Sequence, residues 1–108
     1  MMQVRRFLLP AVLLIAGSLT AIAAGMTTVT QQGRKFSVSD RHISRGDTVR
    51  FKNEDKFVHQ IYVELPGFTY ESDEQPPGEN IDVTFPKSGL FEVRCHIHPK
   101  MLLRVDVH

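Results

Sequence analysis

The chain has 108 residues, a length that predicts one domain, with 13 Lys and Arg against 12 Asp and Glu for a formal net charge of +1. This balance, with no basic patch, argues against a nucleic-acid-binding protein. The sequence holds a single cysteine, which excludes an intramolecular disulfide.

The first 23 residues have the three parts of a secretory signal peptide. Residues 1–6 are short and basic, residues 7–22 are almost wholly apolar, and Ala21-Ile22-Ala23 supplies the small residues that a signal peptidase needs. We therefore predict a signal peptide at 1–23 and a mature domain at 24–108, located in the periplasm. The alternative is an uncleaved membrane anchor, but the apolar run is short for a span of ~20 residues and Pro10 interrupts it.

The rest of the chain alternates apolar and polar residues in short segments separated by Gly and Pro, as half-buried strands do. We predict strands at 35–39, 48–52, 59–65, 81–85, 91–95 and 103–107, with a loop at 68–80. No amphipathic helix is predicted there, so the fold class is all-β, a sandwich or a barrel. The predicted core consists of the inward residues Phe36, Val38, Val49, Phe51, Ile61, Val63, Ile81, Val83, Phe85, Phe91, Val93, Val105 and Val107.

Four metal donors stand out near the end of the chain and in one strand upstream. Residues 95–101 read CHIHPKM, in which Cys95, His98 and Met101 are spaced three apart, so one loop can direct them at a common point. His59 lies on the inward face of a predicted strand and can add a fourth donor. A thiolate with two imidazoles and a weak thioether suits copper in electron transfer, whereas zinc does not usually take a thioether.

Each donor also has an ordinary interpretation. Cys95 could be a buried structural thiol, Met101 a core residue and His59 a hydrogen-bonded core histidine. His96 is an alternative to His98 as the ligand. Because His96 follows the cysteine directly, the two side chains would point to opposite faces of a strand, which favours His98.

These elements together resemble the cupredoxins, small blue copper proteins such as plastocyanin, pseudoazurin and amicyanin. Residues 46–55 (GDTVRFKNED) resemble the turn, strand and polar loop that precede the first histidine ligand. Residues 77–79 (PGE) and 85–89 (FPKSG) resemble the hairpin that leads to the cysteine strand, and residues 95–101 match the ligand loop. The resemblance covers the chain from about residue 36 to 107.

The resemblance implies a cupredoxin-like Greek-key β-sandwich with one copper ion, Cu(I) or Cu(II), at one end. It implies His59, Cys95 and His98 as equatorial ligands and Met101 as the axial ligand. The implied function is a blue (type 1) copper carrier that passes single electrons between redox partners by outer-sphere transfer, and not an enzyme. The expected partners are a cytochrome, a dehydrogenase or a reductase. We expect a monomer, with no membrane association in the mature form.

The resemblance also implies a docking surface. The ring edge of the second histidine, His98, would lie in an apolar patch with Ile97, Pro99 and Phe68. The acidic segment 71–79 is a second candidate, for a basic partner, although a solvated loop is the simpler interpretation.

The chain departs from the family pattern at three positions. Gln60 stands where an Asn usually ties the two ligand segments together, His96 where Ser or Thr often follows the cysteine, and Leu103 where Gly is often found. These departures leave rivals open: a copper-binding module for periplasmic storage or delivery, a small enzyme or accessory subunit with a non-blue copper centre, and a metal-free sandwich.

Overall fold

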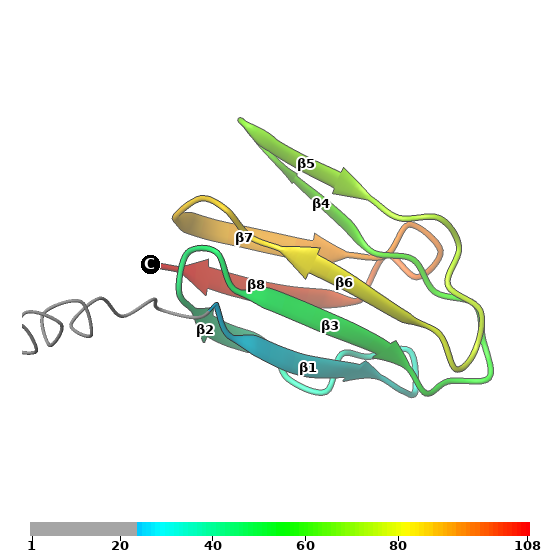
Figure 1. Cartoon of the computed structure of the whole chain (residues 1–108). Helices are drawn as coiled ribbons and strands as arrows, with labels where there is room; N and C mark the ends of the chain where they lie inside the picture. Colours follow the sequence, from blue (N-terminus) through cyan, green and yellow to red (C-terminus); the bar gives the residue numbers. More distant parts are fainter. Residues whose placement is uncertain (1–23) are drawn as a thin grey trace, which may run out of the picture.

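The structure is a computed structural model that describes residues 24–108, so the predicted signal peptide lies outside the described residues. The described chain is all-β and forms two sheets (Figure 1). Within it, no helix has the length and apolar character needed to cross a membrane.

The smaller sheet has three strands in the order β1-β3-β6. It consists of β1 (Met26–Gln31), β3 (Thr48–Asn53) and β6 (Asn80–Thr84). β1 runs parallel to β3, and β6 runs antiparallel to β3, with Phe51 opposite Ile81.

The larger sheet has five strands in the order β2-β8-β7-β4-β5. Its strands are β2 (Asp40–Ile43), β8 (Leu102–Val107), β7 (Gly89–Arg94), β4 (Tyr62–Leu65) and β5 (Phe68–Glu71). β2 is parallel to β8, and the other pairs are antiparallel. In Figure 1 the smaller sheet lies over this one, which confirms the predicted β-sandwich.

The core fills the space between the sheets and agrees closely with the prediction. All of the predicted core residues are buried except Val38 and Ile81, which are partly buried against the same cluster. The prediction omitted Val29, Ile43 and Leu103, which are also buried. Alternating inward residues from both sheets therefore form a single core.

Three phenylalanines join the sheets at one end of the sandwich. The ring of Phe85, just after β6, lies 5.4 Å from that of Phe91 in β7 and 5.8 Å from that of Phe68 in β5 (centroid distances). Phe68 and Phe91 meet edge to face at 5.5 Å. These geometries are the favourable ones for aromatic pairs, so the cluster adds to the stability given by burial.

The strand prediction was wrong in several places. Residues 35–39 form no strand, because the chain turns through Gly33 and Arg34, both at positive φ, and only Phe36 bridges back to Gln31. The predicted loop 68–80 contains β5, and both β1 and β2 were missed. The strand predicted at 59–65 begins only at Tyr62, as β4. β1 reads MTTVTQ, with Val29 its one buried apolar side chain, so it lacks an apolar alternation.

The strand directions bring several loops to one end of the molecule. β1, β3 and β7 all end at the same end of the sandwich (Figure 1). The loops after β3 and β7 hold every candidate metal donor. The aromatic cluster lies toward the other end, beside the turn between β4 and β5.

We expect Phe85→Ala to lower the free energy of unfolding by about 3–5 kcal/mol, because it leaves a cavity between the two sheets. Leu90→Ala on β7 is the control, since Leu90 is 57% exposed, and should change stability by about 0.5 kcal/mol or less. Urea unfolding of the metal-free protein measures both. Equal losses in the two variants would contradict the placement of this cluster.

Candidate metal centre

Three of the four predicted donors meet at the loop end of the sandwich. One ligand atom from each of His59, Cys95 and His98 lies within 4.8 Å of the others. His59 and Cys95 are buried, and His98 is partly buried. The sandwich therefore brings together one sulfur and two nitrogens from two loops that are distant in sequence.

Backbone pairing fixes the position of His59. His59 forms an isolated β-bridge with Gln75, in which each backbone N–H donates to the other residue's carbonyl, at 3.0 and 2.8 Å. The segment that contains Gln75 follows β5. The first histidine is thus held by the part of the chain that sequence analysis interpreted as a loop.

A buried carboxylate fixes the orientation of the His59 ring. Nε2 of His59 lies 2.7 Å from Oδ2 of Asp55, whose side chain is only 6% exposed. The backbone N–H groups of Gly33 and Arg34 donate to the same carboxylate at 2.6 and 2.9 Å. Burial raises the pKa of Asp55, but the hydrogen bonds from His59, Arg34 and Gly33 outweigh it, so the pKa lies below its usual value.

This carboxylate selects the nitrogen that His59 presents to the site. An ionised Asp55 can only accept hydrogen bonds, so Nε2 of His59 carries the proton and donates a hydrogen bond to the carboxylate. Nδ1 is then the free donor nitrogen, and it faces Nδ1 of His98 at 3.1 Å. A carboxylate on the outer nitrogen of a histidine is the usual way to orient a metal ligand and to strengthen its donor atom.

Two buried amides stabilise the backbone behind this pair. Nδ2 of Asn53 donates to the carbonyls of Phe57 and Gln75, and Oδ1 of Asn53 accepts from the N–H of Asp55 at 2.9 Å. The Gln75 side chain donates to two further carbonyls and accepts from Gln31 at 2.8 Å. Removing one member would leave buried polar groups unpaired, so this network resists rearrangement.

His98 connects the buried donors with the surface. Its ring centroid lies 4.8 Å from that of His59 and 6.3 Å from that of the exposed Phe57. Burial, then the proximity of His59 and Arg34, lowers its pKa, although Asp55 opposes this. A lowered pKa favours the neutral imidazole, the form that binds metal ions.

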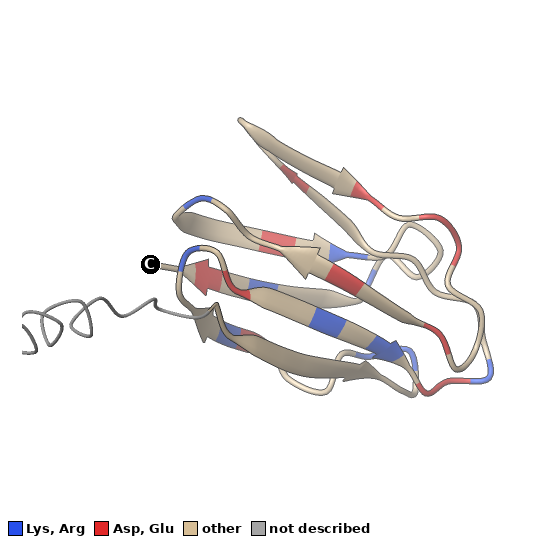
Figure 2. Ribbon diagram, in the orientation of Figure 1, with Lys and Arg blue, Asp and Glu red and all other residues tan. Residues whose placement is uncertain are grey.

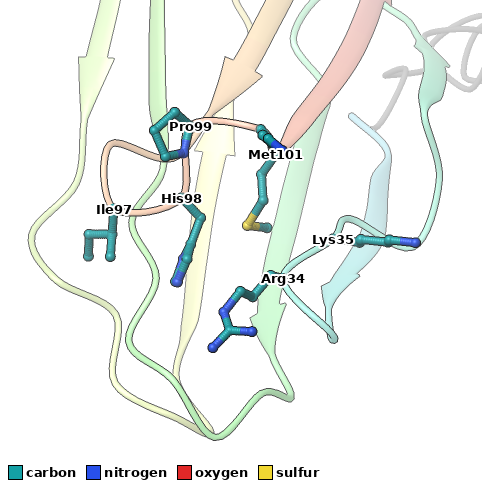
Figure 3. A pocket seen from close by; sticks show the side chains of 7 residues that line it. Arg34, Lys35, Ile97, His98, Pro99 and Met101 are labelled. Atoms are coloured by element: carbon teal, nitrogen blue, oxygen red, sulfur yellow. The ribbon is translucent and has the colours of Figure 1, made fainter.

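The donor loop is closed by a short turn. The N–H of Met101 donates to the carbonyl of His98 at 3.0 Å, and Met101 is buried just before β8. Met101 and His98 line one surface pocket, and Figure 3 shows both side chains pointing into it. Met101 therefore remains a candidate for a fourth ligand.

The other histidine of this loop lies elsewhere. His96 is exposed and packs on Tyr62, with the ring centroids 4.0 Å apart. Its Nε2 lies 3.9 Å from a carboxylate oxygen of Glu71. Of the two histidines in the loop, the structure brings His98 to the site.

Gln60 does not tie the two donor segments together. Its amide donates to the carbonyl of Ser72 at 2.9 Å and lies 3.4 Å from the Glu71 carboxylate, so it binds the segment after β5. Sequence analysis missed Asp55 and Gln75, which position His59 instead. A carboxylate four residues before His59 was an available signal for Asp55, but nothing in the sequence pattern identified Gln75.

The donor set fits a metal ion that accepts both soft and borderline ligands. A buried thiol beside two imidazoles offers a thiolate and two nitrogens, which suits copper or zinc. An open coordination position is not needed for electron transfer, and the buried environment of His59 and Cys95 limits access of water. His59, Cys95 and His98 lie close enough together to form a type 1 copper site.

No protein-family model matches the sequence, and no curated protein matches it. Solved structures do match. A purple cupredoxin from Nitrosopumilus maritimus has a TM-score of 0.68 at 20% identity, over 76% of this chain and 99% of that one. A mutant of amicyanin in its reduced Cu(I) form has a TM-score of 0.72 at 22% identity, over 81% of this chain and 86% of that one.

The chain has the cupredoxin fold. A copper-containing nitrite reductase (NirK) from Thermus scotoductus SA-01 also matches, with a TM-score of 0.68 at 28% identity. The match covers 83% of this chain but only 23% of the reductase. A cupredoxin fold therefore also occurs as part of a larger enzyme, and the function has to be argued from the site.

We expect Asp55→Asn to weaken metal binding by about 10–100-fold. The carboxylate accepts hydrogen bonds from His59 and from two backbone N–H groups, and the single oxygen of an amide cannot accept all three. Competition against a Cu(I) chelator of known affinity measures the change. Long-range ¹H–¹⁵N correlation spectra of the metal-free protein should show the Nε2–H tautomer of His59 in the wild type.

Glu54→Gln is the matched control, because Glu54 is exposed and its carboxylate contacts only Lys52, at 3.5 Å, among the described residues. It should leave the affinity within about twofold of wild type. Equal affinities for Asp55→Asn and wild type would show that the carboxylate does not position His59.

Proposed function

We propose that the protein is a blue (type 1) copper protein that carries single electrons between redox partners. One observation carries the proposal: a cysteine and two histidines converge within 4.8 Å in a buried site of a cupredoxin fold. Thiolate stabilises Cu(I), and imidazole also accommodates Cu(II), so one rigid donor set serves both states.

In this proposal the equatorial ligands are Cys95, His59 and His98, and Met101 is the axial ligand. Copper bound there supplies a one-electron couple. Asp55 keeps Nδ1 of His59 directed at the site, and the turn from His98 to Met101 sets the spacing of the last two donors. A donor set that is held in place needs little rearrangement when the charge of the ion changes, which favours fast outer-sphere transfer.

The cellular context is part of the proposal. The signal-peptide pattern of residues 1–23 supports export to the periplasm and a mature chain of residues 24–108. A lone buried thiol in an oxidising compartment is protected when a metal occupies it. We propose a monomer that meets its partners transiently and has no catalytic activity of its own.

Copper storage or delivery is the rival function. The pocket at His98 and Met101 opens to the surface, where an acceptor protein could approach the ion. The buried hydrogen bonds of His59 favour the carrier, because delivery requires ligands that rearrange easily. The two functions differ in how fast copper leaves and in whether the couple is reversible.

With Cu(II) bound, we expect an intense visible thiolate-to-copper absorption band and a narrow copper hyperfine splitting in the EPR spectrum. Both should be lost in Cys95→Ala, because the band arises from the thiolate ligand. In Met101→Leu we expect the colour to stay and the reduction potential to rise by about 60 mV or more, a tenfold change for one electron, since a donor to Cu(II) is removed.

Met26→Leu is the control for the axial ligand, because Met26 is 57% exposed at the start of β1. An ordinary weak Cu(II) spectrum, or colour that survives without Cys95, would contradict the carrier. Rapid loss of Cu(I) to an acceptor together with irreversible voltammetry would favour delivery instead.

A further inference from the structure

The surface pocket at the metal centre is lined by cations. Around Ile97, His98, Pro99 and Met101 it has three basic residues, Arg34, Lys35 and Lys100, which we call the basic rim. No carboxylate lines this pocket. Figure 3 shows Arg34 below the His98 and Met101 side chains, with Lys35 to its right.

The charges of the basic rim are available to a partner. All three residues are exposed, and none forms an ion pair within residues 24–108. Three other cations of the described chain pair with carboxylates: Arg50 with Asp82, Lys52 with Glu54 and Arg94 with Glu92. Three unpaired cations therefore lie around the one donor ring that reaches the surface, with no carboxylate among the residues that line the pocket.

Arg34 is held in position rather than extended into solvent. Its guanidinium carbon lies 3.9 Å from the ring centroid of Phe57, and that ring meets His98 edge to face. Its backbone N–H is fixed by Asp55. An ordered guanidinium at an interface loses little entropy on binding and can accept a carboxylate in a bidentate pair.

Exposed apolar side chains lie next to these cations. Ile97 is 44% exposed and Phe57 is 41% exposed, and Pro99 is exposed between His98 and Lys100. Apolar residues with a charged border form the usual anatomy of a protein interface. Phe68 was expected beside His98, but it packs with Phe85 and Phe91. The aromatic ring beside His98 is that of Phe57.

A group of exposed carboxylates lies outside this pocket, near the other histidine of the donor loop. Glu71 approaches His96, and Asp73 and Glu74 follow it in the exposed segment after β5. Figure 2 shows this red segment leaving β5, apart from the blue residues of the loop after β1. The basic rim and this acidic segment are thus separate surfaces, so a charged partner is oriented as well as attracted.

We propose that the redox partner is an acidic protein whose carboxylates face the basic rim while an apolar spot covers Ile97 and Pro99. This inference rests on the proposed function. It reverses the sequence-based alternative, in which the acidic segment 71–79 binds a basic partner. The contact is small and transient, and attraction at long range sets the rate of encounter more than the affinity.

The test uses two protein probes, ferrous cytochrome b5 as an acidic donor and ferrous cytochrome c as a basic donor. In each reaction one electron leaves Fe(II), giving Fe(III), and reduces Cu(II) to Cu(I), so the loss of the blue band in stopped flow gives the rate. The copper-loaded protein, expressed from the full-length chain, is compared with the triple variant Arg34→Glu, Lys35→Glu, Lys100→Glu.

With cytochrome b5 we expect the wild-type rate to fall as salt is added, and the triple variant to react slower by about tenfold or more at low salt. With cytochrome c the variant should react faster than the wild type. Lys87→Glu is the matched control, because Lys87 is exposed in the turn before β7, away from the pocket, and it should leave both rates within about twofold.

Two results would overturn the inference while leaving the carrier function intact. One is a triple variant whose rate with cytochrome b5 stays within twofold of wild type. The other is a wild-type protein whose rate with cytochrome c falls as salt is added. That result would show that the acidic segment is the docking surface. A protein with no blue band and no electron transfer from either probe would instead overturn the proposed function, and the inference with it.

If the triple variant loses its colour, the double variant Lys35→Glu, Lys100→Glu replaces it. Its rate with cytochrome b5 should be at least about threefold lower than that of the wild type.

Discussion

The hydrogen bond between Asp55 and His59 is the constraint on which the site depends. A single buried carboxylate accepts from His59 and from the backbone of the Gly33–Arg34 turn. It therefore fixes the donor nitrogen of the first histidine and also places the loop that carries Arg34. Burying a carboxylate is unfavourable unless its oxygens accept hydrogen bonds, and here three N–H groups donate to it.

The sandwich supplies the rest of the geometry. β3 and β7 deliver the polar loop and Cys95 to the same end of the molecule, and the bridge between His59 and Gln75 sets the depth of the first histidine. The aromatic cluster stabilises the packing of the two sheets away from the metal donors. The aromatic cluster and the hydrogen-bonded polar site thus lie toward opposite ends of the sandwich, and the single apolar core between the sheets reaches Cys95 and Met101.

The sequence was sufficient for what depends on periodicity and spacing. Alternation predicted β3, β6, β7 and β8 closely, and the three-residue spacing of Cys95, His98 and Met101 placed them in one short loop. It was insufficient where tertiary contacts decide. β1 is a strand because β3 pairs with it, not because its sequence alternates. Gln75 supports the site through a backbone bridge and buried side-chain hydrogen bonds, which leave no sequence pattern. Phe57 reaches His98 only because the loop after β3 folds back.

The protein, rather than the metal, sets the positions of the donors. Crystal structures of the metal-free, Cu(I) and Cu(II) forms test it most directly. We predict that the donor atoms of His59, Cys95 and His98 superpose within ~0.5 Å in all three forms, with the bond from Asp55 to His59 kept. A His59 ring that turns away from Asp55, or donor atoms that move by more than ~1 Å on metal binding, would show that the metal sets the donor positions.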